Sequence, residues 1–407
     1  MFIIGGASAI AFYMAWSIGA NDVANSMATA VGAKAITFKQ AVLIAGVLNL
    51  VGAVFVGGHV TDTVRKGIVD VTGLESEILL LGFISSLLAA AIWVTLSTWK
   101  EMPISTTHSI IGALVGFGLI SGGFSSVIWS KVESVIASWI LSPLAGCIIA
   151  FLIFKIIVRT IFSKDKPVEA AKIVGPIVIG FTALLIVSSL FLKTPLSKNY
   201  NISDLTGIII ACFVGLFVCI LALIILRNIK GKGSEDYLTV EGIFRKLQII
   251  TSCYVAFAHG ANDVANAIGP VAAIVPLAQG ISLGSKIDVP IWLLALGGVG
   301  IAFGCMTWGR RVMKTVGSRI TSLTNTRGFS VDFGAATTVL IASKLGMPIS
   351  TSHTVVGAVI GVGLARGLEA IDLSVIKKIV ISWVLTLPIA AGTSIGIFLL
   401  LKLITGI

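Results

Sequence analysis

Long apolar stretches without Asp, Glu, Lys or Arg recur along the whole chain, and they constrain its fold more than any other feature. They cover residues 1–21, 40–58, 78–99, 102–130, 134–154, 173–192, 205–226, 264–285, 289–309, 345–365 and 379–401. A helix needs about 20 mainly apolar residues to cross the ~30 Å hydrocarbon core of a bilayer. Only 12% of the residues are charged, whereas soluble domains carry about 25%. We therefore predict an all-α polytopic membrane protein, with no room for a soluble domain.

The charges of the chain lie mainly between these stretches. The net charge of +11 at pH 7 could suggest a nucleic-acid partner. Lysines and arginines in membrane loops are better explained by their role in orienting the chain during insertion. We therefore expect a lipid bilayer around the protein and no nucleic-acid partner. The five cysteines stand singly in apolar segments, so we predict neither disulfides nor a cysteine metal site.

The chain contains an internal duplication. Three motifs occur twice, in the same order and with nearly constant spacing. They are GANDVAN at 19–25 and 260–266, PISTTHSIIGALVGFGL at 103–119 with PISTSHTVVGAVIGVGL at 348–364, and SWILSP at 138–143 with SWVLTLP at 382–388. The middle pair is identical at 10 of 17 positions. One duplicated unit of about 150 residues explains all three pairs.

Loop charges indicate that the two copies have opposite orientations. Residues 310–327 contain five basic residues and no acid, whereas the corresponding loop of the first copy, 59–77, contains two basic and four acidic residues. Loops rich in Lys and Arg stay in the cytoplasm, so equivalent loops would face opposite sides. We therefore predict inverted repeats, which in secondary transporters enclose a binding site near the bilayer midplane.

This pattern divides the chain into three parts. We predict a first inverted repeat at 1–157, a connecting segment with two transmembrane helices at 158–246, and a second inverted repeat at 247–407. Basic residues outnumber acidic ones at both ends of the connecting segment, which places those ends in the cytoplasm. The N-terminal stretch carries no positive charge. We therefore expect a multi-pass plasma-membrane protein with its N-terminus outside; the oligomeric state, including a homo-oligomer, stays open.

Two acids lie within the predicted spans, Asp22 and Asp263, each in a copy of GANDVAN. A charge at the bilayer centre costs about 2.5–3.5 kcal/mol, which suggests that these acids serve a function. Carboxylate and amide oxygens suit a hard cation such as sodium. The predicted sodium ligands are Asn21, Asp22, Asn25, Asn262, Asp263 and Asn266. The structural alternative is an aspartate that caps a broken helix. Gly19 and Gly260 predict such a helix break, which would free backbone carbonyls to complete the cation site.

The two PIST motifs predict an anion site. A proline suits the start of a helix and disfavours helix before it, so each motif reads as a tight turn that opens a helix. A helix N-terminus offers free N–H groups and partial positive charge to an anion, and the Ser and Thr hydroxyls add donors. For a single copy, simple capping is the alternative. The predicted anion ligands are Asn25, Ser105, Thr106, Thr107, Asn266, Ser350, Thr351 and Ser352.

Each motif is expected at the tip of a re-entrant helical hairpin, the first at 86–121 and the second at 331–366. Non-helical backbone at membrane depth is tolerated where it lines a cavity. His108 and His353 follow the tips by one turn. Each could transfer a proton, contact the anion, or serve as a structural hydrogen-bonding residue, of which the last is the commonest role of such a histidine.

These motifs resemble those of the inorganic phosphate transporter (Pit) family, which includes sodium/phosphate and proton/metal-phosphate symporters. The resemblance covers almost the whole chain: both copies of GANDVAN match the family signature in full, and the PIST pairs agree as well. It implies cotransport of inorganic phosphate with cations. It also implies binding roles for Asp22, Asn25, Asp263, Asn266 and the two Ser/Thr tips. Some members carry a long soluble insertion between the halves, which residues 155–246 lack.

The function predicted from these observations is sodium-coupled import of inorganic phosphate by alternating access, with sodium as coupling ion and no cofactor. An interior-negative potential opposes the inward movement of an anion by ~2.3 kcal/mol per charge and 100 mV, and bound cations would reverse that sign. The alternatives are proton coupling, a sulfate permease of the same family, and an anion channel. An enzyme is not expected, because the chain has no HExxH, P-loop or nucleophile-elbow motif.

Overall fold

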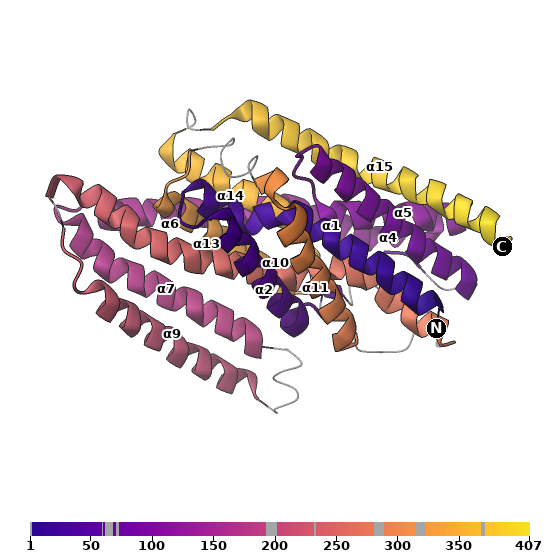
Figure 1. Cartoon of the computed structure of the whole chain (residues 1–407), viewed down its shortest axis with the longest axis horizontal. Coiled ribbons are helices and arrows are strands. Elements are labelled where there is room, and N and C mark those ends of the chain that lie inside the picture. Colours follow the sequence, from indigo (N-terminus) through magenta and orange to yellow (C-terminus); the bar gives the residue numbers. More distant parts are fainter. Residues whose placement is uncertain are drawn as a thin grey trace.

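A computed structural model describes residues 2–58, 60–61, 68–70, 73–192, 202–231, 233–280, 289–313, 322–367 and 371–407. The described residues form helices joined by short turns, and no strand longer than an isolated bridge occurs among them. The helices are α1 (Phe2–Gly32), α2 (Phe38–Val56), α4 (Ser76–Trp99), α5 (Thr106–Gly122), α6 (Trp129–Ile157), α7 (Pro167–Phe191), α9 (Asp204–Leu226), α10 (Asp236–Ala278), α11 (Ile291–Trp308), α13 (Asn325–Lys344), α14 (Thr351–Arg366) and α15 (Leu373–Thr405). Figure 1 shows both chain termini at the same end of the molecule.

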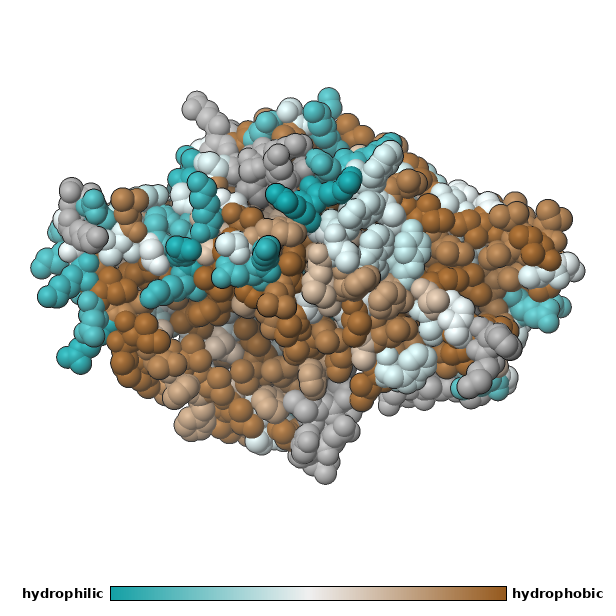
Figure 2. All heavy atoms as spheres, viewed as in Figure 1, coloured by the Kyte–Doolittle hydropathy of each residue, from teal (hydrophilic) through white to brown (hydrophobic). Residues whose placement is uncertain are grey.

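The outer surface matches a membrane protein. In the described part of the chain, nine helices are long and apolar enough to cross a bilayer. Apolar residues cover most of the face shown in Figure 2, and hydrophilic residues gather along its left and upper margins. The outermost helix, α9, exposes large apolar side chains such as Phe213, Phe217 and Ile224, which only lipid or another apolar surface can cover. The predicted all-α polytopic class is confirmed.

The centre of the molecule is built from α1 and α10, which contain the two GANDVAN motifs. Helix α1 packs on α11, and α10 packs on α2. Almost all of α10 beyond its first turns is buried. Helices α7 and α9 form a pair at the left of Figure 1, and α7 lies against α10. The two apolar helices predicted for the connecting segment are therefore present.

The GANDVAN helices are continuous, and the predicted break at the glycines is wrong. Helix α1 runs unbroken past Gly19, and α10 runs unbroken past Gly260. The glycines serve close packing instead. A Cβ at position 19 would lie 1.9 Å from the carbonyl oxygen of Ile301, and one at position 260 would lie 2.1 Å from that of Asn49. Only a residue without a side chain lets the helix backbones approach this closely, and backbone carbonyls are not freed for a cation.

Two helical hairpins carry the PIST motifs at their tips. The first consists of α4 and α5, and the second consists of α13 and α14, which pack against each other within each pair. Both hairpins begin earlier than predicted, at residues 76 and 325. The second extends because Glu241 of α10 accepts hydrogen bonds from the backbone N–H (3.1 Å) and hydroxyl (2.7 Å) of Thr326. This contact stabilises the first turn of α13.

Helix α10 begins within the predicted connecting segment of 158–246. It starts at Asp236 and reaches 43 residues. Much of the loops 59–77 and 310–327, on which the predicted orientation depends, lies outside the described residues. The predicted boundary at 157 is the last residue of α6, and the one at 246 lies within α10.

Candidate functional site

The middle of α1 and the middle of α10 meet the tips of both hairpins in the buried centre of the protein. Each asparagine that ends a GANDVAN motif contacts the hairpin of the other repeat. Asn25 Nδ2 donates to Ser352 Oγ at 2.8 Å, and Asn266 Nδ2 donates to Thr107 Oγ1 at 3.2 Å. Such reciprocal contacts are those of a two-fold arrangement. The structure therefore brings together GANDVAN and PIST residues that lie 159 and 327 positions apart.

The two tips also bind each other directly, through a pair of bonds that we call the tip clasp. Thr107 Oγ1 donates to the carbonyl oxygen of Ile349, and Ser352 Oγ donates to the carbonyl oxygen of Ile104, both at 3.0 Å. All four residues are almost completely buried. The clasp closes the tips over the central asparagines.

The aspartates accept hydrogen bonds from the first threonine of each tip helix. Thr106 Oγ1 donates to Asp22 Oδ2 at 2.8 Å, and Thr351 Oγ1 donates to Asp263 Oδ2 at 2.7 Å. Both carboxylates are fully buried. Asp22 Oδ1 has no hydrogen-bond partner among the described residues. A buried carboxylate oxygen without a partner is costly, and a cation would satisfy it.

The remaining asparagines of the motifs face the hairpins. Asn21 Nδ2 lies 2.9 Å from Thr98 Oγ1 and 3.1 Å from the carbonyl oxygen of Met102. In the second copy, the Asn262 amide lies 3.2 Å from Ser343 Oγ. The Asn21 amide thus connects α1 to the end of α4, and the Asn262 amide connects α10 to the end of α13. Both contacts lie beside the aspartates.

Backbone N–H groups supply the donors at the tips. Ser105 and Ser350 are N-caps: their side chains accept from the N–H of His108 and His353, each at 3.2 Å. The N–H groups of the two residues between each cap and its histidine have no acceptor within their own helix. The structure therefore brings two helix N-termini together, an arrangement that favours an anion.

His259 is a central residue that the sequence analysis missed. It directly precedes the second GANDVAN motif, and its Nε2 lies 2.7 Å from Asp263 Oδ2 and 3.7 Å from Asp22 Oδ2. Its Nδ1 lies 2.5 Å from Asn49 Oδ1. One atom from each of His259, Asp22 and Asp263 can be chosen so that all three lie within 4.8 Å of one another, a spacing that could hold a metal ion. The position before the first motif is Ile18, so the site is not symmetric.

Asp332 is a second residue that the repeated motifs did not predict. It is buried in the middle of α13. Its carboxylate accepts from Thr29 of α1 (2.6 Å) and Ser252 of α10 (2.5 Å). The equivalent position of the first copy is Leu87. A single acid in an otherwise apolar stretch was the available signal.

His108 and His353 do not point to the aspartates. Their rings lie 4.4 Å apart between centroids, and each ring lies against a tryptophan in the last helix of its own repeat: His108 against Trp139, and His353 against Trp383. His108 Nδ1 lies 3.3 Å from the Trp383 carbonyl oxygen, and His353 Nδ1 lies 3.3 Å from that of Trp139. These contacts tie each tip helix to α6 and α15, which favours the structural role among the three considered.

Comparisons with known proteins agree with this geometry. Residues 18–394 match the family described as the phosphate transporter family. A protein of Pyrococcus horikoshii, named as a candidate phosphate permease, is 54% identical over 399 residues, covering 98% of this chain and 97% of its own. A protein of Thermococcus kodakarensis with the same designation is 52% identical over 396 residues, covering 97% of each chain. A solved structure, "The sodium-dependent phosphate transporter", superposes with a TM-score of 0.93 at 45% identity, covering 99% of this chain and 100% of that one.

Proposed function

The chain belongs to the phosphate transporter family, and from this membership we propose that it imports inorganic phosphate together with sodium by alternating access. It is a multi-pass membrane transporter and not an enzyme. The observation that carries the proposal is the junction of two buried aspartates with two helix N-termini. A cation site and an anion site adjoin there.

Sodium is proposed to bind at the aspartates. Asp22, Asn25, Asp263 and Asn266 supply oxygen atoms, which sodium prefers over nitrogen or sulfur. Asn21 and Asn262 would orient these ligands or complete the shell. The unpartnered Asp22 Oδ1 and the relative described as sodium-dependent support this assignment.

Phosphate is proposed to bind at the tips. The N–H groups of Thr106, Thr107, Thr351 and Ser352 would hold the oxyanion, and the hydroxyls of the tips, including Ser105 and Ser350 at the caps, would line its surroundings. Asn25 and Asn266 contact hydroxyls of the tips, so they can reach both the ions and the phosphate. Sodium and phosphate would then raise each other's affinity, because binding coupling is reciprocal.

Proton coupling is the second candidate, and His259 is the observation that favours it. Its imidazole lies beside both carboxylates. The two candidates differ in which gradient drives uptake. Radiolabelled phosphate uptake into proteoliposomes should follow an imposed sodium gradient and persist when the pH gradient is collapsed. Uptake that follows the pH gradient without sodium would support the second candidate, and competition by excess sulfate would identify a sulfate permease.

The tip threonines should contribute to phosphate affinity. Thr106→Ala and Thr351→Ala each remove a hydroxyl that could donate to bound phosphate, and a hydrogen bond to a charged group contributes about 1.5–3 kcal/mol. We expect phosphate affinity to fall about 10- to 100-fold in each variant, measured as binding to purified protein. Thr106→Ser and Thr351→Ser are the matched controls, since they keep the hydroxyl. Equal affinities in the alanine and serine variants would place the site elsewhere.

The inverted topology is also a proposal, supported by the loop charges and the reciprocal contacts. The N-terminus would lie outside and residues 310–327 inside, in the plasma membrane. In a variant without the five native cysteines, a single cysteine placed in 59–77 should react with an impermeant reagent applied to intact cells. A cysteine in 310–327 should react only after permeabilisation. Labelling of both loops from one side would refute inversion.

A further inference from the structure

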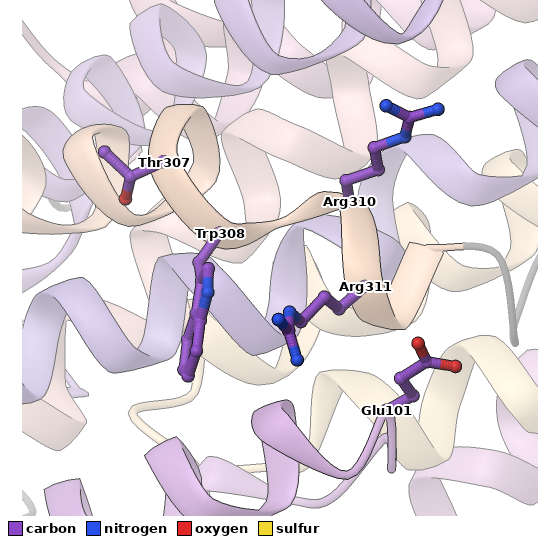
Figure 3. Close-up of a pocket in the computed structure, with 5 residues that line it drawn as sticks. All are labelled: Glu101, Thr307, Trp308, Arg310 and Arg311. Carbon is purple, nitrogen blue, oxygen red and sulfur yellow. The ribbon is translucent and has the colours of Figure 1, made fainter.

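A pocket of about 440 Å³ lies at the C-terminal end of α11. It is lined by Glu101, Thr307, Trp308, Arg310 and Arg311, shown in Figure 3. Its volume is within the range of small-ligand sites, about 300–1,000 Å³, so it can hold a hydrated oxyanion. The central ion site as described above uses none of these residues.

The pocket lies at the depth of the central site. Gly309, directly before the arginines, packs against Val23, because a Cβ at position 309 would lie 2.3 Å from Val23 Cγ1. Val23 is the neighbour of Asp22 in the chain. Charged side chains at membrane depth face water-filled cavities and mark ion pathways. Arg310 and Arg311 are both exposed, and guanidinium groups at this depth would require water around them.

The tip of the first hairpin separates the pocket from the central site. On the pocket side, Arg311 donates to the carbonyl oxygen of Trp99 at 3.3 Å. On the other side, Asn21 donates to the carbonyl oxygen of Met102 at 3.1 Å. A displacement of this tip would therefore connect the pocket with the phosphate ligands.

The arginines occur in one repeat only. Helix α2 ends as α11 does: a Cβ at Gly57 would lie 2.4 Å from Val264 Cγ1, the neighbour of Asp263. Gly57 is followed by Gly58, whereas Gly309 is followed by Arg310. Positive charge therefore flanks the central site on one side of the two-fold arrangement, with no counterpart at the position following Gly57.

We propose that this pocket is a vestibule that binds the phosphate oxyanion without sodium, on the path between the central site and the cytoplasm. This inference rests on the proposed function. Arg310 and Arg311 would supply the charge-assisted hydrogen bonds that recognise a phosphate group. Each arginine lies over an aromatic ring. The Cζ of Arg311 is 5.2 Å from the ring centroid of Trp308, and the Cζ of Arg310 is 5.9 Å from that of Phe38.

Glu101 forms the wall of the vestibule at the hairpin tip. Its backbone φ is +58°, and the equivalent residue of the second hairpin is Gly346, with φ +68°. The N–H groups of Glu101 and Met102 donate to the carbonyl oxygens of Thr98 and Ser97, which closes the C-terminus of α4 in a left-handed turn where glycine is the usual residue. The negative charge of Glu101 facing the pocket (Figure 3) would weaken phosphate binding and so favour release.

The test measures radiolabelled phosphate binding to the full-length protein in zwitterionic nanodiscs, with and without sodium. We expect a weak sodium-free component that falls about tenfold or more in R310Q/R311Q, while a sodium-dependent component is still present. Lys39→Gln is the control, because Lys39 is exposed and lies next to Phe38 but does not line the pocket. This variant should leave the sodium-free component unchanged.

The outcomes separate this inference from the proposed function. Sodium-free binding that is absent in the wild type, or equal in the wild type and R310Q/R311Q, overturns the vestibule. Loss of sodium-free binding in discs that contain anionic lipid would mean that lipid headgroups occupy the pocket, which overturns its transit role. If the wild type lacks the sodium-dependent component, the proposed coupling fails, whatever the arginine variant shows.

Discussion

Replacing Asp22 or Asp263 by asparagine is expected to raise the sodium concentration needed for half-maximal phosphate uptake about 10- to 100-fold. Asparagine nearly preserves the shape but removes the charge that a cation needs. An interaction with a charged group contributes about 1.5–3 kcal/mol, and about 1.4 kcal/mol corresponds to a factor of ten. Phosphate affinity should fall at fixed sodium and partly recover at saturating sodium. The measurement is uptake into proteoliposomes over a sodium titration.

Other roles of the aspartates give different results. A proton-carrying aspartate would lose gradient-driven uptake in the asparagine variant, and added sodium would not restore it. A structural aspartate would lower the yield of folded protein and leave the sodium dependence of the remainder unchanged. Asp372→Asn, which changes the exposed N-cap of α15 and none of the predicted site residues, is the control. Wild-type sodium dependence in both central variants would remove the proposed mechanism.

Gly19→Ala and Gly260→Ala should abolish transport and destabilise the protein by about 3 kcal/mol or more, the upper range for overpacking. The added methyl groups would lie 1.9 Å and 2.1 Å from backbone oxygens of the facing helices, which cannot turn away as a side chain can. We expect a lower melting temperature of the detergent-solubilised protein together with loss of phosphate uptake.

Gly6→Ala is the matched control for Gly19→Ala, because it lies in the same helix and a Cβ there would meet nothing within 4 Å. It should leave stability and transport near the wild-type values. If Gly19→Ala and Gly6→Ala have the same melting temperature, the close approach of α1 and α11 does not limit stability.

The membrane class, the hairpins and the residues that meet at the centre were predictable from the sequence. The duplication links distant segments, because two copies of each motif imply that they pack in equivalent surroundings. The hydrogen bond between Asn25 and Ser352 could not be derived from their spacing in the sequence. Each residue lies in a repeated polar motif, however, and this predicted a common site. Hydrophobic length alone was enough to place helices such as α7 and α9.

The errors arose where tertiary contacts override local sequence. Gly19 disfavours helix in isolation, yet the facing backbone of α11 requires a glycine there. Asp332 was not predicted as a site residue, because its hydroxyl partners come from α1 and α10, far away in the chain. His259 and Asn49 belong to different repeats, and neither is part of a repeated motif. No local pattern could have paired them.

The tip clasp has a consequence for the energy efficiency of the transport cycle. A cotransporter must reorient when it is empty or fully loaded, and must not do so when it carries only sodium, since each such passage dissipates the gradient. The hydroxyls of Thr107 and Ser352 donate to the opposing carbonyls of the tip clasp. A carrier that closes through this clasp leaves neither hydroxyl buried and unpaired, which is what a return step needs. Sodium that drew the carboxylates away from Thr106 and Thr351 would leave their hydroxyls unpaired until phosphate arrived. Closing the carrier with sodium alone would then cost free energy, because two buried hydroxyls would lack acceptors. This cost would suppress the passage of sodium without phosphate.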